Sequence, residues 1–123
     1  MKHNFKNLKI WQMSMDLTDL VFDYIKDIPD SERYGLKDQI NRCSCSIPSN
    51  IAEGSGKRTN VHFAEFLSTA LTSSFELETQ LLICERRNYG EKNKRDDCLS
   101  LVNEIQRMIF SFRDTVINNK TTS

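Results

Sequence analysis

The stretch "CLSLVNEIQRMIFSFRDTV", residues 98–116, has the most regular pattern in the chain. Its apolar side chains recur in alternating steps of four and three residues, at Cys98, Val102, Ile105, Ile109, Phe112 and Val116. Side chains at these spacings share one face of an α-helix, because the helix has 3.6 residues per turn. The stretch therefore predicts a long amphipathic helix with one buried face.

Three earlier segments repeat this pattern and predict three more helices. The segment from about residue 59 to 88 follows a Thr59 cap and carries Phe63, Leu67, Ala70, Ser74, Leu77, Leu81 and Cys84. The segment from about residue 34 to 53 carries Leu36, Ile40, Cys43, Ile47 and Ile51. The segment from about residue 8 to 27 carries Leu8, Trp11, Met15, Phe22 and Ile25, with aspartates on its outer side.

The connections between these segments are short. Pro29, the "GSGK" of residues 54–57 and Gly90 each interrupt a helical pattern. Helices joined by short connections pack as antiparallel neighbours. The sequence therefore predicts an all-α protein with an antiparallel up-and-down four-helix bundle over residues 1–118. The last residues, 119–123, are expected to form a frayed tail.

The balance of charge limits the classes of partner. The chain of 123 residues has 17 basic and 17 acidic side chains, so its formal net charge is zero. No overall field attracts it to nucleic acid or to an anionic membrane, and such binding would need a local patch. The opening residues lack a secretory pattern, and no apolar run approaches the roughly 20 residues of a membrane span. We expect a cytoplasmic protein without membrane contact, whose cysteines are thiols.

The stretch "CSCSIPSNIAEGSGK", residues 43–57, has no charged residue before Glu53. On a helical wheel one of its faces holds only small side chains, those of Cys45, Ser49, Ala52 and Gly56. A surface helix normally presents charged side chains to water, so this face is expected to lie in a subunit interface. The alternative is that one of the two later helices covers it within a single chain. Pro48 is expected to bend the helix or make it locally irregular.

A second face of the same helix is polar. With two carboxylates of the following helix it makes up a candidate structural network, formed by Gln39, Arg42, Ser46, Asn50, Glu53, Glu76 and Glu78. This set has no histidine and no nucleophile beside a base, so a buried network that fixes helix register is the preferred interpretation over an enzyme site. His3 and His62 have no partners at zinc-ligand spacing, and Cys43 and Cys45 point about 200° apart. We therefore expect no catalysis, no metal and no cofactor.

Several motifs resemble one bacterial family, the four-helix-bundle proteins named after intervening sequences in 23S ribosomal RNA genes and also called S23 ribosomal proteins. "RYGLKDQINRCSCSIPSNIAEG", residues 33–54, resembles its central signature. "FKNLKIWQMSMDL", residues 5–17, resembles its opening, and "ELETQL", residues 76–81, resembles a motif of its third helix. The chain departs from the family at Thr72 and Ser73, where Gly-Ser is usual.

The resemblance implies a homopentameric ring of four-helix bundles. It also implies a relation to the accessory variability determinant of diversity-generating retroelements, a basic protein that binds nucleic acid and a reverse transcriptase. The present chain differs from that protein in having no net charge.

Basic side chains gather near both predicted ends of the bundle. One group is Lys2, Lys6, Lys9, Lys57 and Arg58, with Lys120 close by. The other group is Arg86, Arg87, Lys92, Lys94 and Arg95. A ring would repeat either group, and either one is a candidate surface for structured RNA or DNA. The sequence thus predicts a non-enzymatic, oligomeric interaction module, and the alternatives are a protein scaffold without nucleic-acid binding or a purely structural ring.

Overall fold

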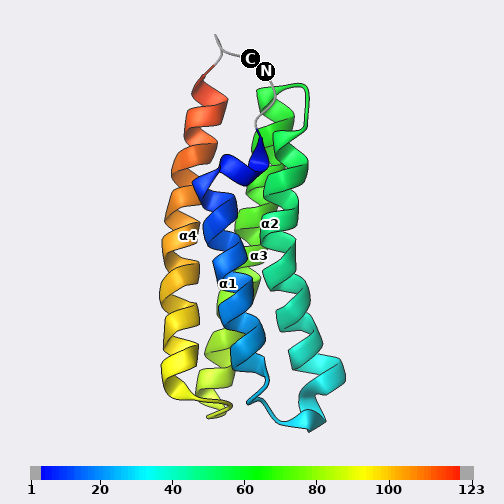
Figure 1. Ribbon diagram of the computed structural model, residues 1–123, viewed down its shortest axis with the longest axis vertical. Coiled ribbons are helices and arrows are strands. Elements are labelled where there is room, and N and C mark those ends of the chain that lie inside the picture. Colours follow the sequence, from blue (N-terminus) through cyan, green and yellow to red (C-terminus); the bar gives the residue numbers. More distant parts are fainter. Residues whose placement is uncertain (1–3, 120–123) are drawn as a thin grey trace.

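The computed structural model describes residues 4–119, which form a bundle of four helices (Figure 1). The four long helices are α1 (Lys9–Ile25), α2 (Asp38–Ser55), α3 (Asn60–Arg86) and α4 (Lys92–Asn118). Three short helical turns precede α1 or α2, namely η1 (Phe5–Asn7), η2 (Asp30–Glu32) and the π-helical η3 (Arg33–Lys37). Residues 4–119 contain no strand, so the predicted all-α fold is confirmed.

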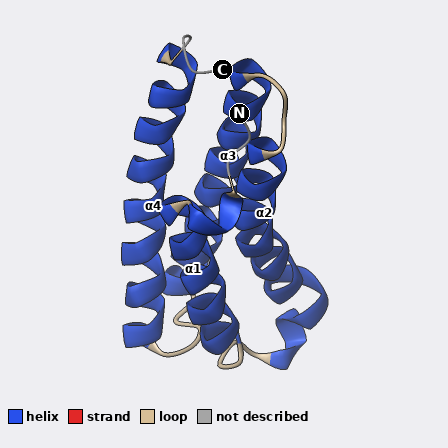
Figure 2. Ribbon diagram, turned by 45° about the horizontal axis from the view of Figure 1, so that its top comes forward, coloured by secondary structure: helices blue, strands red, loops and turns tan. Residues whose placement is uncertain are grey.

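The helices run up and down in chain order. α1 packs against α2 and α4, and α3 packs against the same two helices. The side of the bundle formed by α1 and α2 therefore lies across from the side formed by α3 and α4. The α2–α3 connection lies at one end, and the α1–α2 and α3–α4 connections lie at the other (Figures 1 and 2). The predicted tail lies outside the described residues except for Asn119, whose carbonyl accepts a hydrogen bond from the Asn60 side chain.

The predicted stripes of α3 and α4 form the core. All seven stripe residues of α3 are buried, and in α4 five of the six are buried while Phe112 is partly buried. Thr59 caps α3 as predicted, because its hydroxyl accepts the backbone N–H of His62. The regular spacing of apolar residues in α3 and α4 thus correctly predicted which face of each helix is buried.

The stripe predicted for α1 is wrong at two positions. Met15 is 41% exposed and Phe22 is 44% exposed. The buried face of α1 is instead the neighbouring one, built on Leu17, Val21 and Tyr24. This face was not recognised in the sequence because it also contains two polar residues, Ser14 and Thr18. Both are buried, and their hydroxyls donate to the carbonyls of Ile10 and Met15. A hydroxyl that bonds within its own helix can be buried without leaving an unpaired donor.

Helix α2 continues without a break through Pro48. The irregular backbone lies before α2, in the π-helical turn Arg33–Lys37. At the other end of the helix, Gly54 lies so close to α3 that a Cβ atom there would be 2.6 Å from Cβ of Phe66. The missing side chain therefore permits the close approach of α2 and α3 just before their connection.

Candidate nucleic-acid interface and contact faces

One end of the bundle carries more basic than acidic side chains. The described segments 4–15, 54–64 and 115–119 contain no Asp or Glu, although Glu53 is exposed in the last turn of α2 and Asp114 in the last two turns of α4. They form the start of α1, the α2–α3 connection and the end of α4, which lie in the same half of the bundle (Figure 1). Its basic side chains, Lys6, Lys9, Lys57 and Arg58, are all exposed. We call these four residues the basic end; Lys2 and Lys120 lie outside the described residues.

The α2–α3 connection positions two of these cations. The backbone N–H of Lys57 donates to the carbonyl of Gly54, and its ammonium lies 4.9 Å from the centre of the Phe66 ring. Arg58 directly precedes the Thr59 cap of α3. The positive end of the α3 helix dipole therefore adds to the two side-chain charges. Within residues 4–119 none of the four basic-end side chains makes an ion pair.

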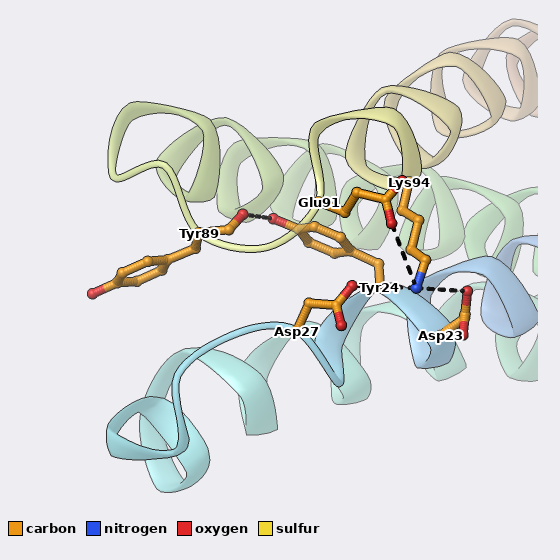
Figure 3. Close-up of polar contacts among 6 residues, drawn as sticks. All are labelled: Asp23, Tyr24, Asp27, Tyr89, Glu91 and Lys94. Atoms are coloured by element: carbon orange, nitrogen blue, oxygen red, sulfur yellow. Dashed lines mark hydrogen bonds and ion pairs between the residues drawn. The ribbon is translucent and has the colours of Figure 1, made fainter.

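At the opposite end, acidic partners neutralise part of the second predicted cluster. The Lys94 ammonium lies 3.2 Å from Asp27, 3.4 Å from Asp23 and 3.9 Å from Glu91 (Figure 3). The hydrogen bond to Asp27 raises the pKa of Lys94; desolvation opposes this rise, and Asp23 adds to it. Likewise, Lys92 pairs with Asp96 at 2.7 Å, one helical turn further along α4. These two lysines already have counter-ions in the fold.

Arg95 is not a surface residue, contrary to the prediction. It is 4% exposed, and its guanidinium donates to the Tyr89 carbonyl at 2.9 Å. The Tyr24 hydroxyl donates to the same carbonyl at 2.7 Å (Figure 3), and burial raises the pKa of Tyr24. The turn can approach this closely because Gly90, at φ +75°, lies against the Tyr24 ring. Arg95 therefore holds the α3–α4 connection, and of that cluster only Arg86 and Arg87 are exposed without an ion pair in the described chain.

The predicted polar network is smaller than expected. Ser46 and Ser73 join α2 to α3 through hydroxyl oxygens 2.8 Å apart, and the Asn50 amide donates to the Ser46 hydroxyl. The remaining predicted members do not extend this buried contact. Gln39, Arg42, Glu53 and Glu76 are exposed, because they lie toward the outside of the bundle.

Three charged members of the predicted network, Arg42, Glu78 and Glu76, have other partners. The Arg42 guanidinium pairs with Asp38 on the surface of its own helix, at 3.0 Å. Glu78 accepts a hydrogen bond from Gln106 of α4 and so faces the other neighbour of α3. Glu76 accepts a hydrogen bond from the Cys43 thiol. The polar contacts between α2 and α3 thus comprise Ser46 with Ser73, supported by Asn50, together with Cys43, which bonds to Glu76 and Gln80 of α3.

The small face of α2 is open in the single chain. Cys45, Ser49 and Gly56 are exposed, and Ala52 is half-buried. Neither α3 nor α4 covers this face, so the alternative of packing within one chain is wrong.

A second surface with large exposed apolar side chains was not predicted. Phe75, Leu82 and Ile83 of α3 are exposed, and the exposed Thr72, Glu76 and Thr79 lie beside them. Beside them, Leu71 and Phe75 of α3 face Phe110 of α4 across a groove of about 320 Å³. The sequence did contain a signal, since these large apolar residues fall outside the buried stripe of α3.

Residues 4–119 show neither a cluster of metal ligands nor a helix that could cross a membrane. Within residues 4–119 no three His, Cys, Asp or Glu side chains come together closely enough to hold a metal. All four cysteines are free thiols. In the same residues no helix has both the length and the apolar composition that crossing a membrane requires.

Comparisons with known proteins agree with the resemblance. The family model of the 23S rRNA-intervening sequence proteins matches residues 6–111. The chain belongs to this family. A crystal structure of a protein of unknown function from the S23 ribosomal protein family, from Bacteroides thetaiotaomicron, is similar with a TM-score of 0.78. The similarity covers 85% of this chain and 97% of that one, at 21% sequence identity, so it supports the fold alone. No curated protein matches the chain.

Proposed function

We propose that this family member is a non-catalytic, self-associating module that binds structured RNA or DNA through its basic end. The observation that carries the proposal is the separation of charge: the basic end has four exposed cations without ion pairs, whereas the opposite end mixes cations with acidic partners. Unpaired cations can replace the counter-ions that surround the phosphates of nucleic acid. The release of these counter-ions into solution drives binding.

Self-association multiplies the small charge of one basic end. Four cations per chain would give a salt dependence of only about −3.6 in log–log slope, at roughly −0.9 per phosphate contact. A ring presents several copies on one side, and linked contacts raise the overall affinity. The open small face of α2 supports such self-association, and the resemblance to the family favours a homopentamer. Four free thiols, two of them buried, fit a cytoplasmic setting.

The test compares two charge reversals of equal size. Lys57→Glu/Arg58→Glu changes the basic end, and Arg86→Glu/Arg87→Glu changes an exposed basic pair at the opposite end by the same number of charges. Binding of a labelled RNA hairpin and of a DNA hairpin of the same sequence is measured by fluorescence anisotropy over a salt series.

We expect the first variant to bind at least ten-fold more weakly at low salt and to lose about two units of salt slope per bound chain. The second variant should keep most of the affinity. Equal losses in both variants would contradict the role of the basic end, and no binding of the unmodified protein at low salt would favour the alternative, a protein scaffold.

A further inference from the structure

Two uncharged faces lie on opposite sides of the bundle. The first, which we call the α1/α2 face, consists of Met15 and Phe22 of α1 with Cys45, Ser49 and Ala52 of α2. The second, which we call the α3/α4 face, consists of Phe75 and Leu82 of α3 with Phe110 of α4. Each helix pair packs together, and the two pairs lie across the bundle from each other.

The α1/α2 face is located by the contacts on either side of it. Asp23 and Asp27 bond to Lys94 of α4, so the flank of α1 that carries them faces α4. Phe22 is about 100° around the helix from Asp23, toward α2. On α2, Ser46 bonds to Ser73 of α3, and Cys45 lies about 100° away from Ser46, toward α1. The two exposed apolar side chains of α1 therefore border the small side chains of α2.

The α3/α4 face carries large side chains that project from the bundle. Phe75 is 50% exposed and Phe110 is 56% exposed, and they line the same groove. The Gln106 amide donates to Glu78 and Arg113 donates to Ser68, which places this side of α3 against α4 along their length. Half-exposed phenylalanines on paired helices are an unusual surface for a lone bundle, because an apolar patch of this kind normally marks an interaction site.

We propose that the α3/α4 face of one copy packs against the α1/α2 face of the next copy. This inference rests on the proposed self-association and assigns its surfaces. The phenylalanines of one face project, and the small side chains of the other leave room for them. Projecting side chains that fit between the helices of a partner are the basis of helix packing. Two α1/α2 faces brought together would bury little apolar area beyond Met15 and Phe22.

Charged side chains border both faces. Asp19 is exposed on α1 next to the α1/α2 face and Lys26 one turn after Phe22, and within the described chain neither makes an ion pair. Arg107 is exposed and lines the groove of the α3/α4 face, also without an ion pair in that part of the chain. An ion pair between Asp19 of one copy and Arg107 of the next, at the edge of the interface, would favour this pairing.

Pairing of two different faces has a consequence for symmetry. Each copy has two neighbours, so the contact continues from copy to copy until it closes into a ring or extends as a filament. A contact of one face with itself would stop at a dimer. The two arrangements can therefore be separated by blocking one face at a time.

The experiment measures absolute mass by light scattering for two single variants and their mixture. Phe110→Arg blocks the α3/α4 face and Ser49→Arg blocks the α1/α2 face; Phe75→Arg and Met15→Arg are second variants should either one fail to fold. Thr69→Arg is the control, because Thr69 is exposed on α3 about 120° around the helix from Phe75. We expect the unmodified protein and the control to form an oligomer larger than a dimer, and each blocked variant to be a monomer.

An equimolar mixture of the two blocked variants should form a dimer, since it contains one intact face of each kind. A single variant that remains a dimer, or a mixture that remains monomeric, would overturn the pairing. A monomeric unmodified protein would overturn self-association itself, whereas loss of RNA binding in the basic-end variant would leave this inference unaffected.

The thiol of Cys45 reports the same contact from the other side. In a Cys43→Ser background, maleimide should modify Cys45 several-fold more slowly in the oligomer than in the Phe110→Arg variant, although Phe110 belongs to the opposite side of the bundle. An unchanged rate would contradict the proposal, because a contact between two α3/α4 faces leaves Cys45 open in both proteins.

Discussion

Replacing Gly54 by alanine tests the close approach of α2 and α3. The new Cβ would lie 2.6 Å from Cβ of Phe66, 2.9 Å from Cδ1 of Phe63 and 3.3 Å from the Phe63 carbonyl oxygen. The Phe63 ring is buried against Phe112, and the Phe66 Cβ and the carbonyl oxygen move only with the backbone of α3. Ordinary contact begins at 3.4 Å, so the two helices must separate by several tenths of an ångström.

The magnitude follows from two opposing effects. Forcing an extra methyl group into a packed contact costs about 1–3 kcal/mol. Replacing a helical glycine stabilises the protein by about 0.4–1 kcal/mol, because the unfolded chain loses conformational freedom. Gly56→Ala is the matched control, because Gly56 lies two residues further on with a negative φ, and the nearest atom to its Cβ is 3.6 Å away. The difference between the two variants isolates the clash, at about 1–3 kcal/mol.

The assay is urea unfolding followed by circular dichroism at one fixed protein concentration, since self-association makes stability depend on concentration. We expect Gly54→Ala to have the lower midpoint and Gly56→Ala to match or exceed the unmodified protein. Equal midpoints for the two variants would refute the reasoning, because they would mean that α2 and α3 do not meet at Gly54.

Three further predictions concern the core and the α3–α4 connection. Tyr24→Phe removes one of two hydrogen bonds to the Tyr89 carbonyl and should lower the free energy of unfolding by about 1 kcal/mol; a change within error would mean that this bond adds nothing to stability. Ser46→Ala and Ser73→Ala should be coupled by about 0.5–1.5 kcal/mol in a double-mutant cycle, and additive effects would contradict the contact between their hydroxyls. Burial, with a smaller contribution from Asp97, raises the pKa of Cys98 to about 12, so the native thiol stays protonated while the unfolded thiol ionises from about pH 8.5. The unfolded state then binds fewer protons, and stability should fall as the pH rises above about 8.5, less steeply in Cys98→Ala, as measured by urea midpoints between pH 8 and 10; parallel slopes would count against the burial effect.

The helices that carry the basic end could be predicted because their signals are local. The stripes of α3 and α4 repeat every three or four residues over about five to six turns, and the Thr59 cap bonds only three residues away. The basic end was predicted for the same reason, since short connections already place Lys57 and Arg58 at the same end as the start of α1.

The predictions that failed depended on contacts between distant parts of the chain. Arg95 lies three residues before Cys98 and so continues the buried stripe of α4, but only the path of the α3–α4 connection brings the Tyr89 carbonyl to its guanidinium. Its neighbour Lys94 forms ion pairs with Asp23 and Asp27 of α1, about 70 residues earlier in the chain. The sequence pattern could not show that the charge of Lys94 is neutralised by these distant residues.

The number of helices, their order and the buried stripes of α3 and α4 could all be predicted from the residues alone, because helical periodicity is a property of consecutive residues. The sequence did not determine which of two adjacent apolar stripes of α1 is buried, since that depends on where α2 and α4 pack against it. Nor did it reveal that Phe75 and Phe110 share one groove, because they lie on different helices. Only the tertiary structure decides which faces remain open, since a face is exposed or covered by the positions of its neighbours and not by its own residues.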